Sequence, residues 1–142
     1  MAIIDYAHTP DALENVLKTI NKFSSNNQII TVFGAGGDRD KTKRPLMGAI
    51  AEKYSDLIVL TSDNPRHENP QKIIDDIKKG IIKVKKLIQN SSRERAIQEA
   101  FSKARSGDII LIAGKGHENY QEIKGKKHSF DDKLVVNKIL NL

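Results

Sequence analysis

The stretch Asp56-Leu57-Ile58-Val59-Leu60-Thr61-Ser62-Asp63-Asn64-Pro65-Arg66-His67-Glu68 decides the fold expected for this chain. A short run that is apolar at every position, Leu57–Leu60, is typical of a strand buried on both faces of a parallel sheet. The polar residues after it precede a helical pattern that begins at Pro70, so they form the loop at the carboxyl end of the strand. Open α/β sheets bind ligands at that edge, although a solvated turn is the commoner interpretation of one such loop taken alone.

Apolar runs of the same kind recur on both sides of this stretch. Buried strands are expected at Ile29–Phe33 and Ile109–Ala113, a short strand at residues 2–6, a weaker one at 85–89, and a hairpin at residues 120–123 and 127–130. Amphipathic helices are expected to begin near Thr9, Pro45, Pro70, Ser92 and Asp131. This alternation predicts a single α/β domain over residues 1–142. It is a Rossmann-like, three-layer fold with a mostly parallel sheet of about six strands and helices on both faces.

Composition narrows the classes of function. The chain has 142 residues, no cysteine and a net charge of +6, and no apolar run approaches the length of a membrane span. Its start lacks the pattern of a signal peptide, so a cytoplasmic location without membrane attachment is expected. The densest basic cluster is typical of the solvent-exposed face of a helix and of the segment that follows the helix. It comprises Lys78, Lys79, Lys83, Lys85 and Lys86. With few aromatic residues as well, nucleic-acid binding is not expected.

Three polar loops follow the three most apolar strands, at residues 34–44, 61–68 and 114–120. Because parallel strands end at the same edge of a sheet, these loops are expected to meet there. Together they supply both charge signs: Asp38, Arg39, Asp40, Lys41, Asp63, Asn64, Arg66, His67, Lys115, His117 and Glu118. Such a mixture suits a zwitterionic ligand better than a polyanion.

Familiar site motifs are weak or missing. The glycines at 34–37 do not complete a G-x-G-x-x-G fingerprint, and no G-x-x-x-x-G-K-[ST] phosphate loop occurs in the chain. His67 and His117 have no third ligand at a characteristic spacing, so no metal site is expected. The sequence also lacks a G-x-S-x-G nucleophile motif, which leaves no catalytic residue to assign.

Four motifs, in order along the chain, carry a family resemblance. They are Asp5-Tyr6-Ala7-His8-Thr9-Pro10-Asp11-Ala12-Leu13, Gly36-Gly37-Asp38-Arg39-Asp40-Lys41-Thr42-Lys43-Arg44-Pro45-Leu46-Met47-Gly48, Ser62-Asp63-Asn64-Pro65-Arg66 and Ala113-Gly114-Lys115-Gly116-His117-Glu118. They resemble the third, C-terminal domain of the Mur ligases, in the branch that adds meso-diaminopimelate to UDP-MurNAc-L-Ala-D-Glu. The resemblance implies an ATP-dependent amide ligase of peptidoglycan synthesis, and so of cell-wall biogenesis, cell shape and cell division.

The resemblance also implies residue roles. Arg39, Asp63, Asn64, Arg66, Gly114 and Glu118 match the family's amino-acid-binding positions, and Asp5, Tyr6 and His8 match a stretch that approaches the nucleotide. ATP and Mg²⁺ are then held mainly by a central domain, and the UDP sugar by an N-terminal domain. Both are absent from this sequence, so Met1 is expected to be a truncation point and the chain alone inactive as a ligase.

Two groups of alternative functions remain for this domain. One is a related domain, from a lysine-adding Mur ligase or a folylpolyglutamate synthetase. In the lysine-adding relatives Arg66 is typically missing, and the Gly114-Lys115-Gly116-His117-Glu118 loop argues against the folate branch. The other is a stand-alone nucleotide- or nucleic-acid-binding α/β module, which predicts salt-sensitive binding to polyanions.

Overall fold

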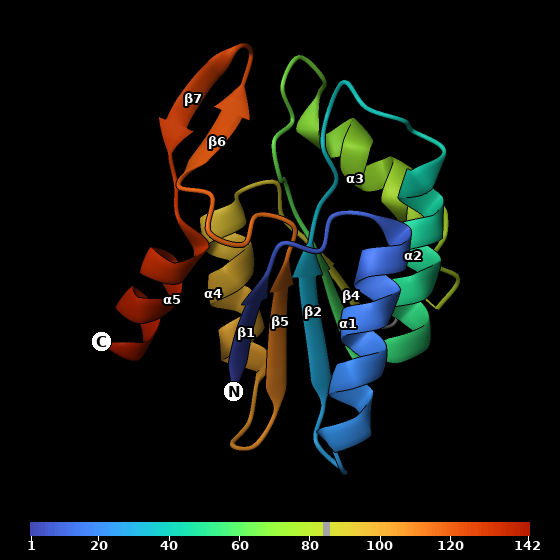
Figure 1. Ribbon diagram of the computed structural model, residues 1–142, viewed down its shortest axis with the longest axis vertical. Coiled ribbons are helices and arrows are strands. Elements are labelled where there is room, and N and C mark those ends of the chain that lie inside the picture. Colours follow the sequence, from blue (N-terminus) through green and yellow to red (C-terminus); the bar gives the residue numbers. More distant parts are fainter. Residues whose placement is uncertain (84–85) are drawn as a thin grey trace.

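The computed structural model describes residues 1–83 and 86–142, in which five parallel strands form one central sheet (Figure 1). The sheet order is β1-β5-β2-β3-β4. The strands are β1 (Ala2–Asp5), β2 (Ile29–Phe33), β3 (Leu57–Leu60), β4 (Leu87–Gln89) and β5 (Ile109–Ala113). β2 and β5 are buried along their whole length, as the unbroken apolar runs predict.

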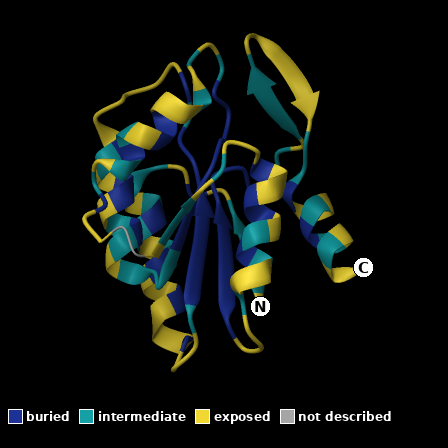
Figure 2. Cartoon of the chain, turned by 180° about the vertical axis from the view of Figure 1, so that it is seen from behind, coloured by how far each residue is buried: buried dark blue, intermediate teal, exposed yellow. Residues whose placement is uncertain are grey.

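Helices cover both faces of the sheet. They are α1 (Pro10–Phe23), α2 (Lys43–Tyr54), α3 (Pro70–Lys78), α4 (Arg93–Lys103) and α5 (Asp132–Leu140). Helices α1, α2 and α3 pack on one face, and α4 and α5 on the other (Figures 1 and 2). Each face has its own core cluster, and the strands of the sheet lie between the two clusters. The predicted three-layer α/β architecture is therefore confirmed.

Local capping explains where several helices begin. The Thr9 hydroxyl accepts a hydrogen bond from the amide of Ala12 at 3.2 Å, and Pro10 fills the first helical position. Ser92 caps α4 through the amide of Arg95 in the same way. The Asp131 carboxylate accepts from Lys133 at 2.9 Å, so Asp131 is the cap and α5 itself begins one residue later.

The strand count differs slightly from the expectation. The sheet in the described part of the chain has five strands rather than about six, because β6 (Tyr120–Ile123) and β7 (Lys126–Ser129) form a separate two-stranded sheet. This antiparallel hairpin stands beyond the carboxyl edge of the sheet (Figure 1). The weak strand expected at 85–89 is present from Leu87, while Lys85 lies outside the described residues.

A buried ion pair ties the helices of one face to the carboxyl edge of the sheet. Arg93 on α4 donates from Nε and Nη2 to the carboxylate of Asp132 on α5, at 2.8 Å each. The same guanidinium donates to the backbone oxygens of Ser62 at 3.0 Å and Ala113 at 3.3 Å. Arg93 therefore fixes the two strand ends from which two of the polar loops depart. No helix in the described residues has the length and apolar character needed to cross a bilayer.

Replacing Arg93 by methionine should destabilise the fold by about 3–5 kcal/mol, because the fully buried Asp132 carboxylate then loses its counter-charge. Urea unfolding measures this loss. Arg95→Met on the same helix is the matched control, because Arg95 is exposed and its loss should change stability by at most about 0.5 kcal/mol. Equal effects of the two substitutions would contradict the assigned role of Arg93.

Candidate functional site

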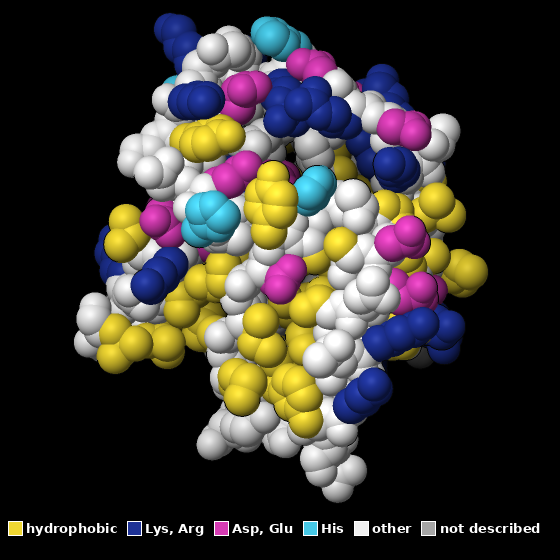
Figure 3. Space-filling view, viewed as in Figure 1, with side chains coloured by type: hydrophobic (Ala, Val, Ile, Leu, Met, Phe, Trp, Pro, Cys, Tyr) yellow, Lys and Arg dark blue, Asp and Glu magenta, His cyan; other side chains and the backbone are white. Residues whose placement is uncertain are grey.

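A pocket of about 380 Å³ opens at the carboxyl edge of the sheet, where loops after β1, β2, β3 and β5 meet. Its lining residues are Tyr6, His8, Thr9, Ala35, Gly36, Arg39, Asp40, Lys43, Arg44, Met47, Asp63, Asn64, Arg66, Gly114 and Glu118. Figure 3 shows basic and acidic side chains gathered around a hollow at this end of the molecule. The expectation that the three polar loops meet at one edge is confirmed by their shared presence in this lining.

The loop after β3 is packed against the loop after β2 by close backbone contact. The amide of Gly37 donates to the carbonyl of Asn64 at 2.8 Å. A Cβ on Gly37 would lie 1.8 Å from the backbone oxygen of Pro65, so no other residue fits at that position. Asp63 and Asn64 are consequently almost fully buried, although both are polar. Their side chains therefore form an ordered, buried part of the pocket lining and do not belong to a solvated turn.

Lys115 is the buried cation behind this wall. Its ammonium, with none of the side chain exposed, donates to Oδ1 of Asn64 at 2.7 Å and to the backbone oxygen of Tyr120 at 2.8 Å. It lies 3.4 Å from the Asp63 carboxylate and 3.5 Å from that of Glu118. One ammonium therefore collects three polar side chains from two different loops and sets their spacing.

Arg44 performs a similar task at the other side of the pocket. Its buried guanidinium donates to Glu68 at 2.7 Å, to Asp76 on α3 at 3.0 Å and to the backbone oxygen of Gly36 at 3.1 Å. The hydrogen bond from Arg44 outweighs burial and lowers the pKa of the Glu68 carboxyl to about 2. The loops after β2 and β3 are thus joined to α2 and α3 by charge.

A more exposed pair closes the outer rim. Nδ1 of His67 lies 2.9 Å from the Asp38 carboxylate, and this hydrogen bond lowers the pKa of the Asp38 carboxyl. The amide of Asp38 donates in turn to Glu68 at 2.6 Å. His67 and Asp38 therefore clasp the two loops to each other and do not point into the pocket lining.

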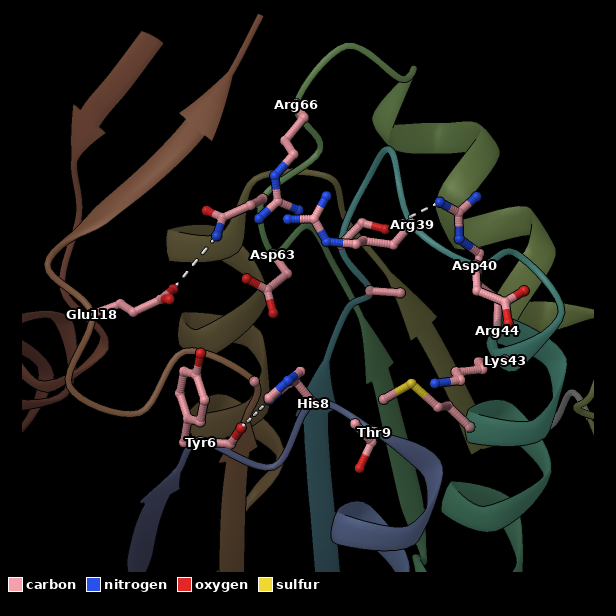
Figure 4. Close-up of a pocket in the computed structure, with 15 residues that line it drawn as sticks. Tyr6, His8, Thr9, Arg39, Asp40, Lys43, Arg44, Asp63, Arg66 and Glu118 are labelled. Carbon is pink, nitrogen blue, oxygen red and sulfur yellow. Dashed lines mark hydrogen bonds between the residues drawn. The ribbon is translucent and has the colours of Figure 1, made fainter. Parts of the chain in front are cut away.

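The structure brings eight of the nine sequence-predicted residues to the pocket: Tyr6, His8, Arg39, Asp63, Asn64, Arg66, Gly114 and Glu118 (Figure 4). The ninth residue, Asp5, is not part of the pocket lining. It lies at the end of β1, where its carboxylate accepts a hydrogen bond from the amide of Ala7 at 2.8 Å. Asp5 thus shapes the turn that carries Tyr6 and His8.

Gly114 is needed for the approach of two loops. Its φ of +117° is unfavourable for other residues, and a Cβ there would lie 2.5 Å from the Asp63 carboxylate. Arg39 is exposed, and its Nη1 donates to the backbone oxygen of Asp38 at 3.0 Å. In Figure 4 the guanidinium groups of Arg39 and Arg66 reach into the same space as Asp63 and Glu118.

This arrangement suits one kind of ligand. Guanidinium groups bind carboxylates in a bidentate manner, and carboxylates bind ammonium groups, so the pocket can hold both ends of an amino acid. Among the described residues, no group of three or more His, Cys, Asp or Glu side chains is close enough to hold a metal ion. The fold and the pocket together define a Rossmann-like domain whose pocket has the charges suited to a small zwitterion.

Comparison with known proteins identifies the family. Residues 1–116 match the family described as "Mur ligase, glutamate ligase domain", and the chain belongs to it. It is 61% identical over 138 residues to a UDP-N-acetylmuramoyl-L-alanyl-D-glutamate–2,6-diaminopimelate ligase from Aquifex aeolicus, covering 97% of this chain and 28% of that protein. An enzyme of the same name from Clostridioides difficile is 59% identical, with 98% and 29% covered.

Solved structures agree. A diaminopimelate ligase structure superposes with a TM-score of 0.92 at 48% identity, covering 99% of this chain and 29% of that one. A folylpolyglutamate synthase/dihydrofolate synthase from Yersinia pestis superposes with a TM-score of 0.64 at 19% identity, covering 99% and 29%, which shows a shared fold only. The chain thus spans less than a third of the length of these relatives.

The Glu68–Arg44 pair predicts a pH dependence of stability. Because the folded-state pKa of Glu68 is about 2, below its ordinary 4.5, the pair stabilises the fold above pH 4.5 and that contribution is lost as the pH falls toward 2. In Glu68→Gln the free energy of unfolding should therefore fall less steeply over this interval. Urea unfolding at a series of pH values measures the slope, and parallel curves for the two proteins would refute the prediction.

Proposed function

We propose that this chain is the amino-acid-binding domain of an ATP-dependent ligase that adds meso-diaminopimelate to UDP-MurNAc-L-Ala-D-Glu in peptidoglycan synthesis. The observation that carries the proposal is a single pocket lined by Arg66, from the Ser62-Asp63-Asn64-Pro65-Arg66 motif, together with Asp63 and Glu118. High identity to diaminopimelate ligases over nearly the whole chain supports it.

The chemistry of the ligand matches the charges of the pocket. meso-Diaminopimelate carries an amino and a carboxylate group at each end. Arg39 and Arg66 are suited to its carboxylates, and Asp63 and Glu118 to its ammonium groups. Asn64 and the backbone of Gly114 complete the proposed binding set. A pocket of about 380 Å³ is within the usual size range for sites of small ligands.

The nucleotide and the second substrate are assigned to other parts of the complete ligase. The described loops contain no phosphate-binding loop and no cluster of metal ligands, so these residues do not fit a complete ATP–Mg²⁺ site. ATP and Mg²⁺ would be held mainly by a central domain and UDP-MurNAc-dipeptide by an N-terminal one. Tyr6 and His8, exposed at the pocket rim, are the proposed nucleotide-proximal groups, with Asp5 supporting their turn. The proposed location is the cytoplasm.

Two rival functions are less favoured. A lysine-adding ligase would leave the pocket face of Arg66 without the carboxylate it is suited to bind, and the likeness to the folate enzyme is one of fold alone. A nucleic-acid-binding module would require a basic surface, whereas this pocket mixes both signs of charge. Salt-sensitive retention on a polyanion column, comparable to that of a known nucleic-acid-binding protein, would support that rival.

Arg66→Ala in the complete ligase should weaken the use of diaminopimelate far more than that of lysine. An unpaired charged group in a site costs on the order of 2–3 kcal/mol, which corresponds to about 30-fold to 150-fold discrimination. Calorimetric titration and kcat/KM with each amino acid measure the change. Arg95→Ala, on α4 away from the pocket, is the control. Equal losses for both amino acids would remove Arg66 from its proposed role.

The 142-residue chain alone should not hydrolyse ATP in response to diaminopimelate, because the described residues contain no complete nucleotide site. A phosphate-release assay with and without diaminopimelate tests this expectation, with the complete ligase as the positive control. Turnover by the isolated chain that depends on diaminopimelate would overturn the proposed division of labour between domains.

A further inference from the structure

The β6–β7 hairpin is attached to the loop after β3, away from the main sheet. The amide of Arg66 donates to the backbone oxygen of Glu122 at 2.9 Å. The amide of Lys124 donates to the backbone oxygen of Arg66 at 2.7 Å. Gln121 donates from its side chain to the backbone oxygen of Asp63 at 2.7 Å. Strand β6 therefore runs beside the pocket loop as a short parallel partner, with an isolated bridge between Arg66 and Ile123.

The side chain of Arg66 is held from three directions. Nε donates to the carboxylate of Glu122 at 3.1 Å, and Nη1 donates to the backbone oxygen of Gly37 at 3.0 Å. Beneath it lies Gly36, where an added Cβ would come within 2.9 Å of Nη1. No described residue accepts a hydrogen bond from Nη2, and Arg66 lines the pocket (Figure 4). One edge of the guanidinium is thus fixed by the protein, and Nη2 is left for a ligand.

From this geometry we infer that Glu122 is the positioning residue for Arg66 and, through it, sets the preference of the pocket for an amino acid with a second carboxylate. This inference rests on the proposed function. Glu122 touches no ligand in this scheme and is absent from the pocket lining. Its carboxylate restricts the rotation of a long, flexible side chain, so that the charge of Arg66 meets the ligand in one orientation.

A purely structural role for the pair explains less. The side chains of Arg66 and Glu122 are 19% and 27% exposed, so water partly screens the pair and limits its contribution to stability. The hairpin is already attached by the two backbone hydrogen bonds, which do not depend on the Glu122 side chain. A carboxylate beside an anion-binding arginine also repels the anion. Its benefit to binding must therefore come from orientation and not from charge.

The test compares diaminopimelate and lysine binding to the complete ligase by calorimetric titration. Glu122→Ala should weaken diaminopimelate binding about tenfold, as expected for residues in one hydrogen-bond network, and leave lysine binding unchanged. Glu122→Gln keeps an acceptor for Nε and should lose less. Gly36→Ala displaces Nη1 while leaving Glu122 intact and should reproduce the selective loss. Lys126→Ala, an exposed position on β7 across from Ile123, is the matched control and should change neither affinity.

Two further measurements separate positioning from general damage. The Nε–Hε resonance of Arg66 should shift in Glu122→Ala without any ligand, because it loses its acceptor. In an Arg66→Ala background, Glu122→Ala should cause no further loss of diaminopimelate binding, since its effect passes through Arg66.

The possible results are distinguishable. A chain that prefers diaminopimelate to lysine equally well with and without the Glu122 carboxylate would overturn this inference and leave the proposed function standing. Tighter diaminopimelate binding by Glu122→Ala would also overturn it, by showing that the charge of Glu122 only repels the ligand. A complete wild-type ligase that does not distinguish the two amino acids would overturn the proposed function, and this inference with it.

Discussion

The ammonium of Lys115 is the interaction on which the pocket depends. The loops that form the pocket contain almost no aliphatic side chains, so apolar packing cannot hold them in place. Lys115 supplies the missing constraint by binding Asn64 and lying within 3.5 Å of both Asp63 and Glu118. The two carboxylates repel each other, and a buried cation between them allows both to remain in one wall. Desolvating this ammonium is costly, and its hydrogen bonds offset that cost.

Two other buried cations repeat this solution around the same edge. Arg93 reaches the backbone at the ends of β3 and β5 from one face of the sheet, and Arg44 reaches Gly36 and Glu68 from the other. Each joins a helix of the apolar layers to a polar loop. The domain therefore has two kinds of cohesion, an apolar one within the layers and an ionic one at the edge. The pocket lies at the edge of the sheet, where ionic contacts replace apolar packing.

Sequence reasoning predicted the parts that follow from periodicity and local chemistry. Unbroken apolar runs indicated the buried strands, Thr9 and Ser92 indicated helix starts, and the common direction of parallel strands indicated that Asp63 and Glu118 would meet. Periodicity could not show that Lys115 and Arg44 turn inward, because burial of a charge depends on partners from distant segments. The contact between Glu122 and Arg66 was equally invisible, since nothing local ties a hairpin to a loop 56 residues away. Asp5 was predicted from its motif to lie near the nucleotide, and that role stays a prediction; its carboxylate accepts a hydrogen bond from the turn that follows it.

The different exposure of these ion pairs has a consequence for how the pocket responds to its solvent. Lys115 is fully buried, so dissolved salt can hardly reach the contacts that hold Asp63, Asn64 and Glu118 together. The pair of Arg66 and Glu122 is partly open to water, and mobile ions screen it. Added salt should therefore leave the contacts of Lys115 unchanged. It should weaken the ion pair between Arg66 and Glu122.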